Sequence, residues 1–130
     1  MTITFYILED VDTTRANLFL CDLIEKKYAP DKHIYIHTAT EQEAKTLDEL
    51  LWTHRVHSFI PHHISGDNSI RSSPIEIGFQ AIPENLSKFN EIIEFVPSDS
   101  EKQAQARERY KYYRQKGFNI TTHKLKTSDL

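Results

Sequence analysis

The stretch ITFYIL, residues 3–8, decides the fold of this chain because it has the composition of a buried β-strand. It is a short apolar run of β-branched and aromatic residues that ends at the charged pair Glu9 and Asp10. Apolar residues then recur at helical spacing before Pro30, which predicts a helix with the buried stripe Leu18, Cys21, Ile24 and Tyr28. Three residues are candidates for the N-cap of this helix: Asp12, Thr13 and Thr14.

The same pattern repeats further along the chain. The run HIYIHT at residues 33–38 predicts a second strand, and Thr40 with Glu43 forms a capping box for a second helix. This helix extends through Trp52 and has the buried stripe Ala44, Leu47 and Leu51. Strand, helix, strand, helix implies parallel strands joined by crossover helices.

The second half of the chain adds further strands and one long helix. We expect short strands in SFIPHH (residues 58–63), IEIGF (75–79) and EIIEFV (91–96), with a turn or short helix over residues 83–89. Residues 65–74 are rich in helix and strand breakers and are expected to form a mobile surface loop.

A last helix is predicted to run to about Lys116. Its N-cap candidates are Ser98, Asp99 and Ser100, and Gly117 supplies its stop. Residues 118–125, FNITTHKL, fit either a final strand or an extended tail. We therefore expect one α/β domain over residues 1–130 with three α/β/α layers, a largely parallel sheet of about five strands, and a flexible tail over residues 122–130.

The composition limits the classes of protein to which the chain can belong. The chain has 130 residues with 38% hydrophobic content, enough for one domain with one sizeable core. Cys21 is the single cysteine, so no internal disulfide forms, as is typical of a reducing compartment. No basic segment followed by an apolar run opens the chain, and no window approaches twenty apolar residues. We expect a cytoplasmic protein that is neither exported nor membrane-spanning.

The sequence offers little catalytic chemistry. The first strand is followed by LEDVDTTR, which has no glycine to cradle a phosphate and so argues against nucleotide binding. Cys21 falls on the buried stripe, which favours an inert thiol. Four histidines lie close together but lack a familiar metal-binding pattern and are interpreted as ordinary surface residues: His54, His57, His62 and His63. We expect no cofactor, no metal and no catalytic residue.

Positive charge gathers near the C-terminal end. Residues 1–100 carry 8 Lys and Arg against 16 Asp and Glu, whereas residues 101–126 carry 8 against 2. On the last helix one face carries Arg107, Tyr110, Lys111 and Arg114, and Arg109 falls off that face. This face fits a solvated helix flank, a nucleic-acid contact or an acidic peptide with an apolar end. The acidic remainder of the molecule would repel a phosphate backbone, which favours the peptide.

Over nearly its whole length the chain resembles the chi subunit family of bacterial DNA polymerase III holoenzyme. The resemblance lies in the order and spacing of TFYIL, DTT, EQEAKTLDELLW, SFIPHH, EFVP and ARERYKYYRQKGFNI. It implies a non-enzymatic clamp-loader accessory protein with a nucleotide-binding-like fold that lacks the glycine fingerprint. It also implies two partners, the small subunit psi and the acidic C-terminal tail of the single-stranded-DNA-binding protein, and it implies that nucleic acid is contacted mainly through that second protein.

In the family, the tail ends in an acidic run and a Pro-Phe with a free carboxylate, which dock beside the last long helix. Matched residue by residue, the resemblance implies a peptide site made of Phe59, Val96, Arg107, Tyr110 and Lys111. The family commonly has a lysine three residues before ARERYK, where this chain has Gln103 with Lys102 beside it.

Two other classes of function stay open. A module that binds single-stranded nucleic acid directly would use the basic helix, but needs aromatic residues along a groove several nucleotides long. A small-molecule enzyme would need a phosphate loop or an acid/base pair.

Overall fold

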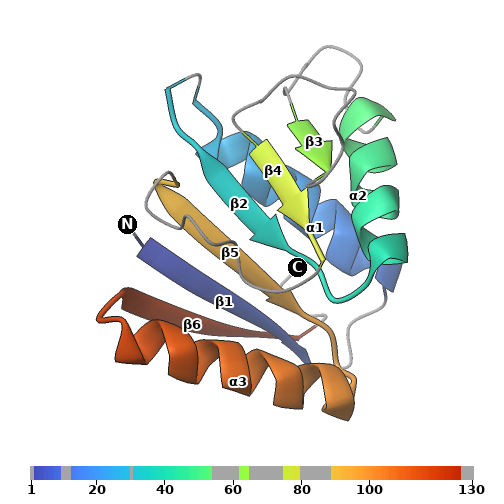
Figure 1. The fold of residues 1–130 in the computed structure, drawn as a ribbon. Helices are drawn as coiled ribbons and strands as arrows, with labels where there is room; N and C mark the ends of the chain where they lie inside the picture. The colour runs from blue at the N-terminus through green and yellow to red at the C-terminus, as the bar shows by residue number, and fades with distance from the viewer. Residues whose placement is uncertain are drawn as a thin grey trace.

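The computed structural model describes residues 2–9, 13–29, 31–53, 62–64, 75–79 and 89–126. Within these ranges the chain forms one parallel sheet with helices on both faces (Figure 1). The strands are β1 (Thr2–Glu9), β2 (Ile34–His37), β3 (His62–Ile64), β4 (Ile75–Gly78), β5 (Glu91–Val96) and β6 (Asn119–Lys126). The helices are α1 (Thr13–Lys27), α2 (Glu41–Thr53) and α3 (Ser100–Gln115).

The sheet order is β3, β4, β2, β5, β1, β6, and every recorded strand pair is parallel. Helices α1 and α2 cover one face, and α3 covers the other (Figure 1). The predicted three-layer α/β fold is therefore confirmed. The described sheet has six strands instead of about five, because residues 119–126 form a strand.

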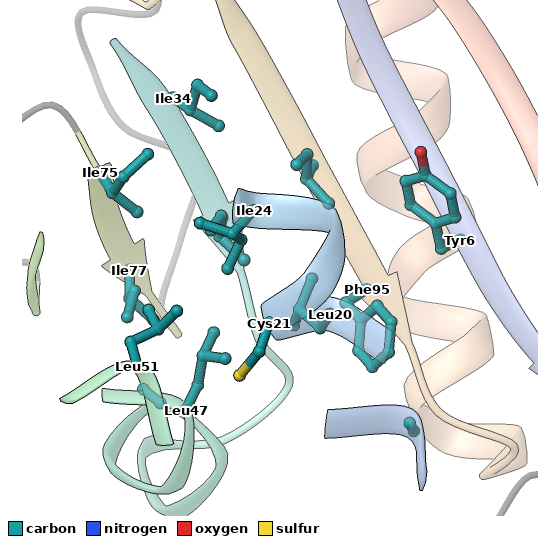
Figure 2. Packing of buried hydrophobic residues seen from close by; sticks show 14 of the residues in the cluster. Tyr6, Leu20, Cys21, Ile24, Ile34, Leu47, Leu51, Ile75, Ile77 and Phe95 are labelled. Carbon is teal, nitrogen blue, oxygen red and sulfur yellow. The ribbon is translucent and has the colours of Figure 1, made fainter. Parts of the chain in front are cut away.

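The larger core lies between the sheet and helices α1 and α2 (Figure 2). Alternate residues of the strands face it, such as Ile34 and Ile36 of β2, because successive side chains of a strand point to opposite faces. Cys21 lies in this core with 1% exposure, which confirms the prediction of a buried thiol. Burial, and to a lesser extent the neighbouring charge of Asp22, raises the pKa of this thiol to about 11.

Helix α1 differs from its prediction at Leu18 and at its end, because its last residue is Lys27 and Tyr28 follows it, half-buried. Leu18 was predicted on the buried stripe, but its exposure is 36%. The stripe instead runs through Ala16, Leu20 and Ile24, which follow one another at intervals of four residues. Leu18 lies two residues from Ala16 and from Leu20 and therefore points to another side of the helix.

Helix α2 begins as the capping box predicts. The Thr40 hydroxyl oxygen accepts a 3.2 Å hydrogen bond from the backbone N–H of Glu43. The Glu43 carboxylate accepts a 2.9 Å bond from the backbone N–H of Ala39, one residue before the N–H of Thr40 that a standard capping box would use. The predicted stripe of Ala44, Leu47 and Leu51 is buried.

Strand β3 begins directly after Pro61 and overlaps the last two residues of the stretch predicted as a strand, residues 58–63. It spans His62–Ile64, and residues 58–61 lie outside the described residues. His62 is 2% exposed, so its interpretation as a surface histidine is wrong. Its Nε2 lies 3.1 Å from the backbone oxygen of Asp48, and its ring packs against Trp52.

The flexible tail predicted over residues 122–130 begins inside a strand, because residues 122–126 are the last five residues of β6 and pair with β1. Residues 127–130, the predicted mobile loop over residues 65–74, and most of the predicted turn over residues 83–89 lie outside the described residues. No helix in the described part of the chain is long and apolar enough to cross a membrane.

Candidate functional site

Three neighbouring strands turn side chains toward α3 and form one wall of a pocket. The parallel register places Phe5 opposite Thr122 and Ile7 opposite Lys124, so these four side chains share a face of the sheet. On the other side of β1, Val96 of β5 lies opposite Ile7. An apolar surface from β1 and β5 is thereby bordered by polar side chains of β6.

Helix α3 forms the other wall. Asp99 caps it, since its carboxylate accepts a 2.9 Å hydrogen bond from a backbone N–H of the first turn. Ala106 and Tyr113, at 5% and 0% exposure, anchor the helix on the sheet. Between them, the half-buried ring of Tyr110 meets Phe5 edge-on, with ring centroids 5.6 Å apart. Tyr110 therefore stands at the boundary between the core and the pocket.

The pocket has a volume of about 400 Å³, within the range of ligand-binding clefts. Its apolar lining consists of Phe5, Ile7, Val96, Ala106 and the ring of Tyr110. Its polar lining consists of Glu9, Gln103, Arg107, Thr122 and Lys124. An apolar hollow bordered by charged groups can take an apolar side chain that carries a charged group beside it.

The two cations of the pocket come from different elements. Arg107 lies on α3 and Lys124 on β6, and both are exposed. Within the described part of the chain, no ion pair is recorded for either side chain. Glu9 adds one negative charge at the end of β1. The cations are thus available to an anionic ligand.

A buried charged network fixes the underside of α3 to the sheet. The carboxylate of Glu94, on β5, is fully buried, and both of its oxygens accept hydrogen bonds from Nε of Arg109, at 3.0 and 2.9 Å. The Tyr113 hydroxyl donates a 2.8 Å bond to Glu94 Oε2. His37 Nδ1 lies 3.3 Å from Glu94 Oε1.

The phenol of Tyr113 is held in its protonated form. Burial, then the charge of Glu94 and the hydrogen bond to it, raise the pKa of Tyr113 far above its ordinary value. Burial and the nearby carboxylates of Glu76 and Glu94 likewise raise the pKa of Tyr35. A protonated Tyr113 can therefore donate its hydrogen bond to the Glu94 carboxylate at neutral pH.

A family model described as "DNA polymerase III chi subunit, HolC" matches residues 1–121 of this chain. The chain belongs to this chi family. The protein described as DNA polymerase III subunit chi from Haemophilus influenzae is 33% identical, over 95% of this chain and 97% of that protein. The chi proteins of Escherichia coli and Pseudomonas aeruginosa are 31% and 25% identical, over 92% and 95% of this chain and 95% and 96% of those proteins.

In this chi-family chain, the structure brings together part of the predicted peptide site. Val96, Arg107 and Tyr110 line the same pocket, although Val96 comes from a strand and the other two from α3. Gln103, one of the two residues added to the predicted peptide site at the lysine position that the resemblance implied, also lines it. Phe59 lies outside the described residues.

Two predicted residues stand apart from the pocket. Lys111 is not among its described lining residues, and its Nζ lies 3.3 Å from Oε1 of Glu108 on the same exposed helix surface. Lys102 likewise is not among the described lining residues, whereas its neighbour Gln103 is. A helical spacing of four places Lys111 on the same stripe as Arg107 but one turn further along.

The residues on the sheet side of the pocket were not predicted from the sequence. Phe5 and Ile7 belong to a strand predicted to be buried, which gives no sign that part of its surface borders a pocket. Thr122 and Lys124 fall in a segment that fitted either a strand or a tail. Their spacing of two was the available signal, because a strand would place both on one face.

Proposed function

We propose that this protein is a non-catalytic accessory subunit of DNA replication that binds an acidic C-terminal tail of the single-stranded-DNA-binding protein. Through psi, it would link that tail to the clamp loader. The observation that carries the proposal is the pocket beside α3, where an apolar lining meets the cations of Arg107 and Lys124. Membership in the chi family supports the replication role.

The pocket suits the end of such a tail. An apolar terminal side chain would enter the hollow between Phe5, Val96 and Tyr110, where full burial stabilises binding by about 1.5–3 kcal/mol. The terminal carboxylate would meet Arg107 or Lys124, and a charge-assisted hydrogen bond contributes about 1.5–3 kcal/mol. Both contacts lie at the surface, so we expect binding that is reversible and weakened by salt.

The proposed function has consequences for cofactors, for cellular location and for contact with nucleic acid. A binding subunit requires no cofactor, metal or catalytic group, and we propose none. A role in bacterial replication places it in the cytoplasm. Contact with nucleic acid would be mainly indirect, through the protein whose tail is bound.

Direct binding of single-stranded nucleic acid is the competing function, and the tyrosines of α3 argue against it. Tyr113 is fully buried, and the ring of Tyr110 is half-buried against Phe5. Tyr112, at 41% exposure, is the ring of the three that stands out to solvent. One exposed ring on a helix makes a poor stacking platform for successive bases.

The test is a titration of the purified protein with three fluorescent ligands. The first is a ten-residue acidic peptide that ends in Phe with a free carboxylate, the second is its C-terminal amide, and the third is a single-stranded oligonucleotide. We expect the free-acid peptide to bind most tightly and amidation to weaken binding at least fivefold. Equal affinity for the amide would remove the carboxylate from the proposal, and tighter binding of the oligonucleotide would favour the competing function.

A further inference from the structure

Strand β6 presents an open sheet edge directly beside the pocket. It is the outermost strand of the sheet, and within the described residues β1 is its strand partner (Figure 1). Six of its eight residues are exposed, and Ile120 and Leu125 are partly covered. A long exposed edge strand carries backbone N–H and C=O groups that can pair with another extended chain.

The charge on this edge favours an acidic partner. Strand β6, residues 119–126, carries Lys124 and Lys126 and no acidic residue, although residues 1–100 of the chain are acidic overall. Lys124 also lines the pocket. The same strand therefore borders the candidate site and offers the cation of Lys124 to a chain that approaches it.

We propose that the acidic segment immediately before the terminal residue of the bound peptide adds to β6 as an extra strand of the sheet. The inference rests on the proposed function, because the terminal residue in the pocket brings the preceding residues to this edge. Main-chain hydrogen bonds to β6 supply sequence-independent affinity, and Lys124 meets the peptide carboxylates. Three preceding residues in extended conformation span about 10 Å, which is the length of about three residues of β6.

The alternative role of Lys124 is protective. Lysines on an edge strand discourage pairing with other chains, and in that role Lys124 would serve solubility alone. The two roles differ in what they predict for the backbone of β6. Pairing protects its outward N–H groups from exchange with solvent, whereas simple charge attraction leaves them unprotected.

Amide hydrogen exchange followed by NMR distinguishes these roles. The full-length protein is measured alone, with an acidic nine-residue peptide that ends in Phe with a free carboxylate, and with the last three residues of that peptide. Both peptides should shift the resonances of Tyr110. At saturation only the longer peptide should slow the exchange of alternate β6 amides, by at least tenfold.

Two other outcomes would each refute a proposal. If the longer peptide binds with β6 exchange unchanged, the extra strand is refuted while the pocket stands. If neither peptide binds, the proposed function fails and this inference fails with it.

A scan of the peptide backbone provides a second test. Methylation of one amide nitrogen at a time removes a donor without a change of side chain. Because alternate N–H groups of an added strand face β6, methylation at one of two adjacent positions should weaken binding at least fivefold and methylation at the other much less. An equal effect at both positions would contradict strand addition.

Discussion

Replacement of Arg109 with alanine should destabilise the fold strongly, although most of the other cations of α3 are exposed. The Arg109 side chain is 16% exposed and binds the fully buried Glu94 carboxylate through two hydrogen bonds of 3.0 and 2.9 Å. Removal of one partner of a buried pair leaves an uncompensated charge and costs about 3–5 kcal/mol. We therefore expect Arg109→Ala to lower the free energy of unfolding by about that amount.

Urea unfolding followed by circular dichroism measures this loss. With a slope near 2 kcal/mol per molar urea, a loss of about 3–5 kcal/mol lowers the midpoint by about 1.5–2.5 M. Arg109→Lys keeps the cation and should recover part of the loss, which keeps the test informative if Arg109→Ala fails to fold.

Arg114→Ala is the matched control. Arg114 lies on the same helix but is exposed, and its replacement should cost less than about 1 kcal/mol. Equal midpoints for Arg109→Ala and Arg114→Ala would refute the reasoning. Arg109 was predicted only to lie off the basic face of the helix, and its pair with Glu94 makes it unsuitable as a neutral control for binding experiments.

Three further predictions concern other parts of the molecule. Arg107→Ala should weaken binding of the acidic peptide by about 1–3 kcal/mol with an unchanged urea midpoint, as measured by fluorescence titration. Gly78→Ala should cost about 1–3 kcal/mol in thermal unfolding, because the added methyl runs into the buried ring of Tyr35; no loss would show that the ring moves aside freely. The pKa of Cys21, raised to about 11, implies a contribution to stability that is complete below pH 9 and lost as the pH rises toward 11. Urea unfolding at pH 8 and pH 10.5 should therefore show a steeper decline for the wild type than for Cys21→Ala, and parallel declines would contradict the assignment.

Capping residues and apolar periodicity, which depend on nearby residues alone, predicted the bounds of α3 and the buried stripe of α2. The bounds of α3 follow from a capping aspartate at one end and a glycine at the other, and Asp99 and Gly117 act in those roles. Gly117 has a φ of 81°, a conformation that side chains with a Cβ rarely adopt. The buried stripe of α2 was likewise predicted, because a strong apolar period needs no knowledge of the partner element.

Pairings across the sheet could not be predicted in this way. Helical spacing placed Arg109 off the basic stripe, but it could not reveal that Glu94 lies beneath it on β5. Strand β6 lacks the apolar alternation of a half-buried strand, since most of its residues are exposed. The pairing of β6 with β1 places Lys124 in the lining of the pocket, and this pairing could not be predicted from the sequence.

The pairing of β1 with β6 has a consequence for synthesis on the ribosome. Phe5 and Ile7 are made more than a hundred residues before Thr122 and Lys124, which lie opposite them. A parallel partner strand can join β1 only after α3 has crossed over the sheet. A nascent chain that has emerged only as far as α3 would thus display Arg107, Phe5 and Val96 without Thr122 and Lys124, the β6 part of the pocket lining, and complete binding of the tail would have to wait until translation has passed Lys124.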